Sequence, residues 1–246
     1  MKILYNIDYL PVYGQKNILS LYTSTPKKNG KGLLEGIEMI LYPGSKIEVV
    51  EVLENGVCQV RTPHYGVDYP IFVDERYLSK SGARDFILPS YEKALEKLRN
   101  IPEGTRYIYG ANFHLGIPRL LKDFEPKVPL NADETKDWIL QGVDCSGLFF
   151  EICEGATFRN CSMLHQMGEE IKIDNIKQLR PLDLILTPSH VAIVESSKVL
   201  VESAFRFHGV HRSTLTLELI QSQIFKGFRI IRPFFKNVDV FCDLFT

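Results

Sequence analysis

Hydrophobic positions in the first third of the chain fall into short runs that are separated by turn residues. In the run 46–52, two apolar side chains alternate with polar ones, as they do in a half-buried strand. Asn55-Gly56 follows this run, and that dipeptide between two such runs is typical of a tight β-hairpin. Further runs of strand type are 10–13, 18–22, 57–60 and 70–73. The pattern predicts an all-β domain over residues 1–85, and strands at this pitch are typical of a small barrel.

The pattern changes to a helical period after residue 89. Apolar side chains from Tyr91 to Leu98 recur at i, i+3, i+4 and i+7, which predicts an amphipathic helix over 90–99. Ser90 suits the N-cap of this helix. We expect the helix to open a second domain, residues 86–246.

A polar entry to an apolar helix lies at residues 144–152. Leu148, Phe149 and Ile152 fall at i, i+1 and i+4, so one helical face can be buried while Cys145 stays in the first turn. Free backbone N–H groups and the helix dipole at that position can lower a thiol pKa from roughly 8.5 to about 3.5–7.5. The sequence therefore predicts a reactive thiolate at Cys145, with a plain buried cysteine as the alternative.

A base for this thiol is available 45 residues further along the chain. His190 heads an apolar run of strand type, and a cysteine at a helix start can meet a histidine at a strand start. The other cysteines and histidines stand in surroundings that favour structural roles. The cysteines expected to be buried apolar residues are Cys58, Cys153, Cys161 and Cys242.

Five ordered blocks within about residues 102–235 resemble the NlpC/P60 family of cell-wall cysteine peptidases. The blocks are Tyr107–Ala111, Asp144–Leu148, Arg159–Gly168, Arg180–Ile185 and His190–Val194. The sequence departs from the family pattern at Tyr109 and Ala111 in the first block and at Leu182, which replaces a glycine, in the fourth. The resemblance implies an α+β fold, with a papain-like catalytic domain whose cysteine-bearing helix packs on an antiparallel sheet. The strands before residue 85 are similar to bacterial SH3-like domains.

The resemblance also implies chemical roles. Cys145 would attack a peptide carbonyl, and His190 would take its proton and then protonate the departing amine. The family often has a histidine about a dozen positions later to orient the first, and here that position is Glu202. A carboxylate can do the same work. His208 is the alternative orienting residue.

The resemblance implies that three more residues bind substrate. Tyr107 matches a tyrosine that lines the nucleophile pocket of the family, although it also fits a plain aromatic strand residue. Asp144 and Ser146 match a pair that holds the free α-amine of the substrate. Asp144 equally suits the N-cap of the helix that follows it.

The resemblance implies a cysteine endopeptidase that hydrolyses peptidoglycan stem peptides, between a γ-linked D-glutamate and a diamino acid. Two alternatives remain open on the residues themselves. The same Cys–His pair would serve a papain-like amidase or acyltransferase. A degenerate domain could also bind murein fragments without cutting them.

Composition narrows the classes further. The chain has 246 residues with 45% hydrophobic content, which excludes a mostly disordered protein. A formal net charge of −1 disfavours nucleic acid or anionic lipid as a partner. Five cysteines without a Cys-x-x-Cys pair indicate neither a disulfide framework nor a zinc site, and no cofactor is expected. No apolar run approaches a membrane span or a secretory leader, so we expect a cytoplasmic protein, with non-classical export as the alternative.

Overall fold

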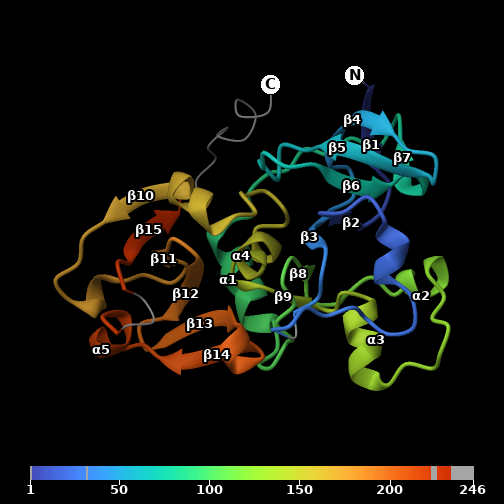
Figure 1. The fold of residues 1–246 in the computed structure, drawn as a ribbon. Coiled ribbons are helices and arrows are strands. Elements are labelled where there is room, and N and C mark those ends of the chain that lie inside the picture. The colour runs from blue at the N-terminus through green and yellow to red at the C-terminus, as the bar shows by residue number, and fades with distance from the viewer. Residues whose placement is uncertain (1, 32, 223–225, 234–246) are drawn as a thin grey trace. The chain divides into compact units, whose positions relative to one another are not determined.

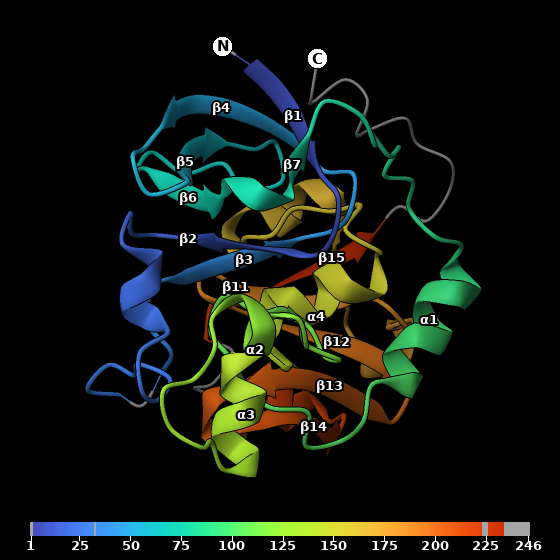
Figure 2. The same ribbon diagram turned by 90° about the vertical axis from the view of Figure 1, so that its right-hand side faces the viewer.

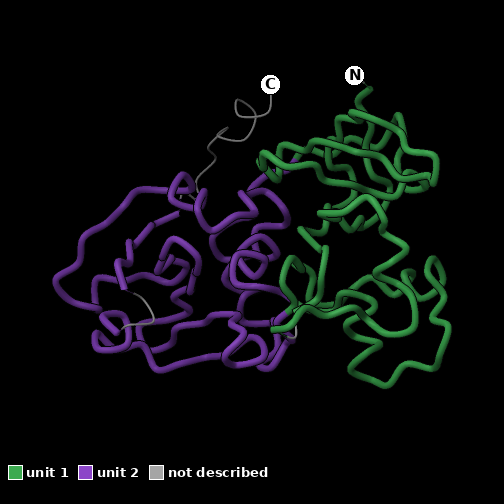
Figure 3. The backbone as a smooth tube through the Cα atoms, viewed as in Figure 1, with its two compact units in different colours: residues 1–85, 108–142 green, residues 86–107, 143–246 purple. Residues whose placement is uncertain are grey.

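The structure is a computed structural model that describes residues 2–31, 33–222 and 226–233 (Figures 1 and 2). The chain forms two compact units, which Figure 3 colours separately. The first unit contains residues 1–85 and 108–142, and the second contains 86–107 and 143–246. The chain therefore leaves the first unit, returns to it, and leaves it again. The assignment of domains to 1–85 and 86–246 stays a prediction.

The first unit is built on one antiparallel sheet of seven strands. The strand order is β3-β2-β6-β5-β4-β1-β7 (Figure 1). Among the described residues no hydrogen-bonded pairing joins the end strands β3 and β7, so no closed barrel is found there. The strands are β1 (Lys2–Asn6), β2 (Leu10–Tyr13), β3 (Ile37–Leu41), β4 (Lys46–Val52), β5 (Val57–Arg61), β6 (Ile71–Asp74) and β7 (Leu78–Ser79).

The predicted hairpin between 46–52 and 57–60 is confirmed. β4 and β5 pair antiparallel, and Gly56 has a φ of 72°, a left-handed conformation that glycine adopts without steric cost. The prediction of a strand at 18–22 is wrong, because Ile18–Leu21 forms the 3₁₀ helix η1. Ile18 and Leu21 are its buried residues, and their spacing of three puts them on one face of a helix with three residues per turn.

Residues 108–142, the second segment of the first unit, are joined to residues 1–85 by side-chain contacts. Asn112 lies in the short strand β8 (Asn112–Phe113), and its amide both accepts from the N–H of Ile40 (2.8 Å) and donates to the carbonyl of Ile40 (2.9 Å). The buried amide thereby acts as one more strand partner for β3. Arg119 pairs with Asp8 at 2.9 Å and so joins the same segment to the chain start. The helices of residues 108–142 are α2 (Leu120–Asp123) and α3 (Ala132–Trp138), and β9 (Gly142–Val143) follows α3. In the first segment of the unit, the 3₁₀ helix η2 (Glu75–Tyr77) precedes β7.

The second unit is built on an antiparallel sheet of six strands in the order β10-β15-β11-β12-β13-β14. Its strands are β10 (Gly168–Ile171), β11 (Leu184–Thr187), β12 (His190–Ser196), β13 (Val199–Ala204), β14 (Gly209–Thr214) and β15 (Arg229–Pro233). Its helices are α1 (Tyr91–Asn100), α4 (Cys145–Ile152), η3 (Cys161–Met167), η4 (Ile176–Gln178), η5 (Phe205–Phe207) and α5 (Leu217–Ile220). The unit therefore has helices packed on an antiparallel sheet, as the sequence predicts.

Both faces of this sheet are apolar. The helices α1 and α4 contact each other, and α4 contacts β12 and β13 on one face (Figure 2). The residues that the sheet buries on that side are Leu184, Leu186, Val191, Ile193, Val201, Val210 and Ile231. The alternate positions form a second core with Ile220 of α5, so neighbouring residues of β12 point to opposite cores. This explains why β12 reads as a continuous apolar run.

The predicted helix at 90–99 is confirmed as α1, and the Ser90 side chain caps it by accepting from the N–H of Lys93. The helix that carries Cys145 differs from its prediction in one respect. Every residue of α4, from Cys145 to Ile152, is buried, rather than the residues of one face. α4 is thus a core helix of the unit, and its position is fixed from all sides.

We predict that Leu148→Ala lowers the free energy of unfolding by about 2–5 kcal/mol, because Leu148 is fully buried in α4 and leaves a cavity. Ile87→Ala in the same unit should change it by less than about 0.5 kcal/mol, since that side chain is 73% exposed. Urea denaturation followed by circular dichroism measures both. Equal losses in the two variants would contradict the assignment of α4 to the core.

Candidate active site

Cys145 is the first residue of α4, and Asp144 is its N-cap. The Asp144 carboxylate accepts a hydrogen bond from the N–H of Gly147 at 2.7 Å. The N-cap role proposed for Asp144 is therefore confirmed. Capping places the Cys145 sulfur at the helix end where backbone N–H groups have no intrahelical partner.

Asp144 and Ser146 belong to a buried polar network that Arg159 completes. The guanidinium of Arg159 donates to Asp144 and to the Ser146 hydroxyl, each at 2.6 Å. The Arg159 and Asp144 side chains are 3% and 7% exposed, so each buried charge is neutralised by the other. The sequence places Arg159 in a matching block but indicates no role for it. Its ion pair with Asp144 fixes the entry to α4.

His190 is the first residue of β12 because the chain turns back on itself just before it. Thr187 of β11 pairs with His190, so Pro188 and Ser189 form a two-residue connection at the end of the hairpin. The imidazole hydrogen-bonds to the Cys145 thiol and, through Nε2, to Glu202. The sulfur and the imidazole that the sequence pairs are therefore in contact.

Glu202 lies on β13, the strand next to β12, and it is the residue that contacts the histidine. Its Oε2 is 2.6 Å from Nε2 of His190, and its side chain is 2% exposed. Arg206 also donates to the same carboxylate oxygen. The other predicted candidate, His208, stacks edge-on against Phe205. Of the two candidates, Glu202 is thus the one whose hydrogen bond to the ring the structure shows, and its orienting role stays a prediction.

The charge state of His190 follows from these neighbours. Burial alone would lower the pKa of the ring, but the hydrogen bonds to Cys145 and Glu202 outweigh it and raise the pKa of His190 to about 9. The pKa of Glu202 is lowered, because the histidine and Arg206 outweigh the burial that opposes ionisation. At neutral pH the site therefore holds an imidazolium against a carboxylate.

A second thiol lies beside the first. The sulfur atoms of Cys145 and Cys161 are 3.5 Å apart. The hydrogen bond to Cys161 and burial raise the pKa of the Cys145 thiol, and His190 opposes them. The same hydrogen bond lowers the pKa of Cys161. The expectation of a lowered pKa at Cys145 is therefore wrong for the resting site, and the two thiols titrate as a coupled pair.

Cys161 is the contact that the sequence does not reveal. The sequence favours a buried apolar residue there, yet Cys161 is only partly buried and starts η3 beside Cys145. Cys58 and Cys153 are buried as expected, and Cys242 lies outside the described residues. The only signal in the sequence is its position within the block 159–168.

Tyr107 is in the same unit and lies against the loop that carries Arg206. Its ring meets that of Phe205 edge-on, with centroids 6.1 Å apart, and its N–H donates to the carbonyl of His208. Tyr107 is not in a strand, so the alternative of a plain strand residue is wrong. Its predicted role toward substrate stays a prediction.

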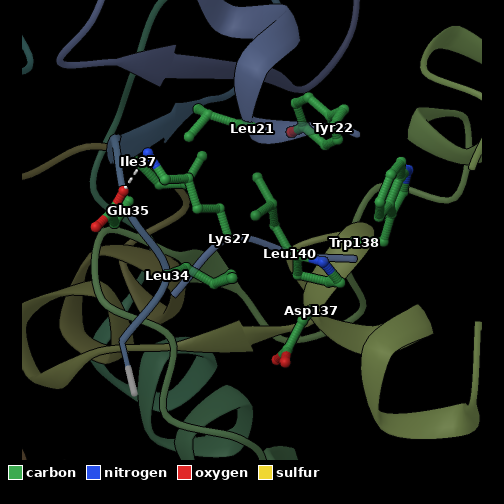
Figure 4. A pocket seen from close by; sticks show the side chains of 10 residues that line it. Leu21, Tyr22, Lys27, Leu34, Glu35, Ile37, Asp137, Trp138 and Leu140 are labelled. Atoms are coloured by element: carbon green, nitrogen blue, oxygen red, sulfur yellow. Dashed lines mark ion pairs between the residues drawn. The ribbon is translucent and has the colours of Figure 1, made fainter. Parts of the chain in front are cut away.

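A hollow in the first unit is separate from this chemistry. It is lined by residues such as Tyr22, Asp137 and Trp138, and none of the predicted site residues belongs to it (Figure 4). Its volume of about 20 Å³ would hold a single water molecule. It is too small for a peptide. Within the described residues, no group of three or more His, Cys, Asp or Glu side chains could hold a metal ion, and no helix is both long and apolar enough to cross a bilayer.

A comparison with solved structures finds several proteins to which the chain is similar. An NlpC/P60 family protein of Bacillus cereus matches 94% of the chain at 11% identity with a TM-score of 0.40, and the chain spans 63% of its length. The P60 domain of an antigen of Mycobacterium avium subspecies paratuberculosis matches 57% of the chain at 18% identity, covers 92% of that domain, and has a TM-score of 0.38. The peptidoglycan hydrolase RipB of Mycobacterium tuberculosis matches 57% of the chain at 18% identity with a TM-score of 0.38, over 65% of its length.

Each of these matches is a weak likeness, with a TM-score below 0.5. No family model matches the sequence, and no curated protein does. At these identities and TM-scores the likeness assigns no activity, so function has to be argued from the contacts of Cys145.

We predict that Cys161→Ala lowers the pKa of Cys145, because it removes the hydrogen bond that contributes most to raising it. The midpoint of the alkylation rate of Cys145 against pH, measured with iodoacetamide and peptide mass spectrometry, should move downward. Cys153→Ala is the control, since Cys153 is fully buried and lies outside the thiol pair. An unchanged or higher midpoint in Cys161→Ala would contradict the coupling of the two thiols.

We predict that Glu202→Gln lowers the pKa of His190 below its value of about 9, because the carboxylate favours the charged ring. An NMR titration of the imidazole measures it. Since the folded pKa is raised above 6.5, the stability from this pair is complete below pH 6.5 and is lost as pH rises through about 9. This loss of stability at high pH should be smaller in Glu202→Gln.

Glu195→Gln is the control for this titration. Glu195 is on the same strand as His190, and its own carboxylate pairs with Arg212. If the pKa of His190 moved equally in both variants, the role of Glu202 would be contradicted.

Proposed function

We propose that the protein is a cysteine peptidase that hydrolyses peptidoglycan stem peptides. One observation carries the proposal: a chain of hydrogen bonds runs from the Cys145 thiol through His190 to the buried carboxylate of Glu202. A nucleophile, an acid–base group and an orienting group in contact are the parts that acyl transfer through a covalent intermediate needs.

The proposed reaction begins in the thiol pair. The Cys145 thiol passes its proton to the thiolate form of Cys161, and the imidazolium of His190 stabilises the Cys145 thiolate that results. The thiolate sulfur attacks the peptide carbonyl carbon, and the carbonyl π electrons move to oxygen. The His190 proton then passes to the nitrogen of the departing amine as the C–N bond breaks, which leaves an acyl-enzyme. Water attacks this thioester with neutral His190 as base, and the sulfur leaves.

Groups around the sulfur suit the transition state. The N–H of Cys145 is at the start of α4, where a developing oxyanion would be stabilised by a fixed donor and by the helix dipole. The Tyr107 hydroxyl is the second donor in this proposal, and one such donor is worth about 2.7–4 kcal/mol. Glu202 keeps the imidazole in one orientation through these steps.

Substrate class is the finer part of the proposal. The resemblance of Asp144-Cys145-Ser146 to the family motif supports a substrate with a free α-amine at its end, which Asp144 and Ser146 would hold. The bond cut would join a γ-linked D-glutamate to a diamino acid. Arg159 already neutralises Asp144, so the ammonium group would bind as an additional partner of a carboxylate that is fixed in place. The strands before residue 85 would form the SH3-like module that accompanies such domains.

Incubation with the tripeptide L-Ala-γ-D-Glu-diaminopimelate tests this function. We predict release of free diaminopimelate, seen by mass spectrometry, and a loss of about 10⁴-fold or more in Cys145→Ala, because the nucleophile is gone. Cys153→Ala is the matched control, since this buried thiol is on the turn that ends the same helix. It should keep its activity.

The outcomes separate the alternatives. Turnover that survives Cys145→Ala would refute the cysteine peptidase. Release of acyl or amide groups from other substrates, without cleavage of the tripeptide, would indicate an amidase or acyltransferase. Binding of the tripeptide with no cleavage would indicate a non-catalytic murein-fragment binder.

A further inference from the structure

The second thiol of the site has a position that peptide hydrolysis alone does not require. Cys161 begins η3 and its sulfur is 3.5 Å from that of Cys145, while Cys153 is fully buried within the core of the same unit. The two sulfurs need to approach by about 1.5 Å to reach the bond length of a disulfide. Cys161 is partly exposed.

The charges around Cys161 favour its ionised form. The hydrogen bond with Cys145 is the largest cause that lowers the pKa of Cys161, and Ser146 and the positive charge of Arg159 add to it. Burial and the negative charge of Asp144 oppose them, but they do not prevail. A thiolate that solvent can reach is the form of cysteine that peroxides oxidise.

We propose that Cys145 and Cys161 are a site of reversible oxidation by peroxides, which joins them in a disulfide and blocks the nucleophile. The disulfide itself is independent of the proposed function. Its consequence, a loss of peptide hydrolysis that a thiol reductant reverses, rests on that function.

The chemistry is complete with hydrogen peroxide as the oxidant. The Cys161 thiolate attacks one peroxide oxygen, the O–O bond breaks, and a sulfenic acid and hydroxide form. The sulfur of Cys145 then attacks the sulfenic sulfur, the S–O bond breaks, and the hydroxyl group leaves as water with the thiol proton. In total two thiols lose two electrons and two protons, and one hydrogen peroxide becomes two waters.

The second thiol also determines how far oxidation proceeds. A sulfenic acid without a neighbouring thiol can be oxidised further to sulfinic acid, which thiol reductants do not restore. A thiol 3.5 Å away captures the sulfenic acid first. The pair therefore protects the nucleophile while it is switched off.

Peptide mapping tests the disulfide without any activity measurement. Trypsin cuts after Lys136, Arg159 and Lys172, so Cys145 lies in peptide 137–159 and Cys161 in peptide 160–172. After treatment with hydrogen peroxide and alkylation of the remaining thiols, we expect these two peptides to be linked, and dithiothreitol should separate them. Because Cys153 lies in the first peptide too, the link should persist in Cys153→Ser and be absent from Cys145→Ser.

The variants also define the results that would overturn the proposal. Wild-type protein without the linked peptides would do so, and so would a link that survives Cys145→Ser. Prolonged treatment with hydrogen peroxide should lower the rate at which the wild type hydrolyses the tripeptide by roughly tenfold or more, and dithiothreitol should restore that rate. Cys161→Ser, measured against its own untreated rate, should lose activity without recovery; recovery equal to the wild type would contradict the capture step. If the tripeptide is not cleaved at all, the proposed function fails and the peptide map still decides this inference.

Discussion

The contact between His190 and Glu202 is the constraint on which the site depends. A carboxylate that is 2% exposed is costly to bury unless opposite charge surrounds it. The imidazolium and Arg206 provide that charge, and both bind the same carboxylate oxygen. The ring is consequently held charged and fixed at one nitrogen. The orientation of the imidazole thus follows from the need to neutralise a buried charge.

The same need organises the site around two buried carboxylates. Asp144 is matched by Arg159, and Glu202 is matched by His190 and Arg206. The two thiols add a further interaction, since the hydrogen bond between them raises the pKa of Cys145 and lowers the pKa of Cys161. The helix-end argument, taken from the sequence, does not include this neighbour, and it therefore misjudges the pKa of Cys145.

Local chemistry made part of the fold predictable. The Asn55-Gly56 hairpin and the capped helix α1 each follow from a few neighbouring residues. Glu202 comes instead from the resemblance to the NlpC/P60 family, which implies an orienting residue about a dozen positions after His190, and Glu202 does contact that histidine. The contact of Cys161 with Cys145 could not be predicted in this way. It depends on where a 3₁₀ helix begins after an irregular segment, which no periodicity encodes. The prediction of a strand at 18–22 was wrong for a related reason, because a short apolar run fits a strand and a 3₁₀ turn equally well.

Departures from the family pattern are compensated by neighbours that the pattern does not contain. Leu182 replaces a glycine and has a φ of 69° in the turn before β11, a conformation that costs a side chain about 1–2 kcal/mol. Its fully buried side chain offsets this, because burying a leucine contributes about 1.5–3 kcal/mol. Glu202 follows the same logic. A histidine at that position could be buried neutral, whereas a carboxylate there needs a second cation. Arg206, four residues later in η5, meets that need, so Glu202 and Arg206 act as a pair.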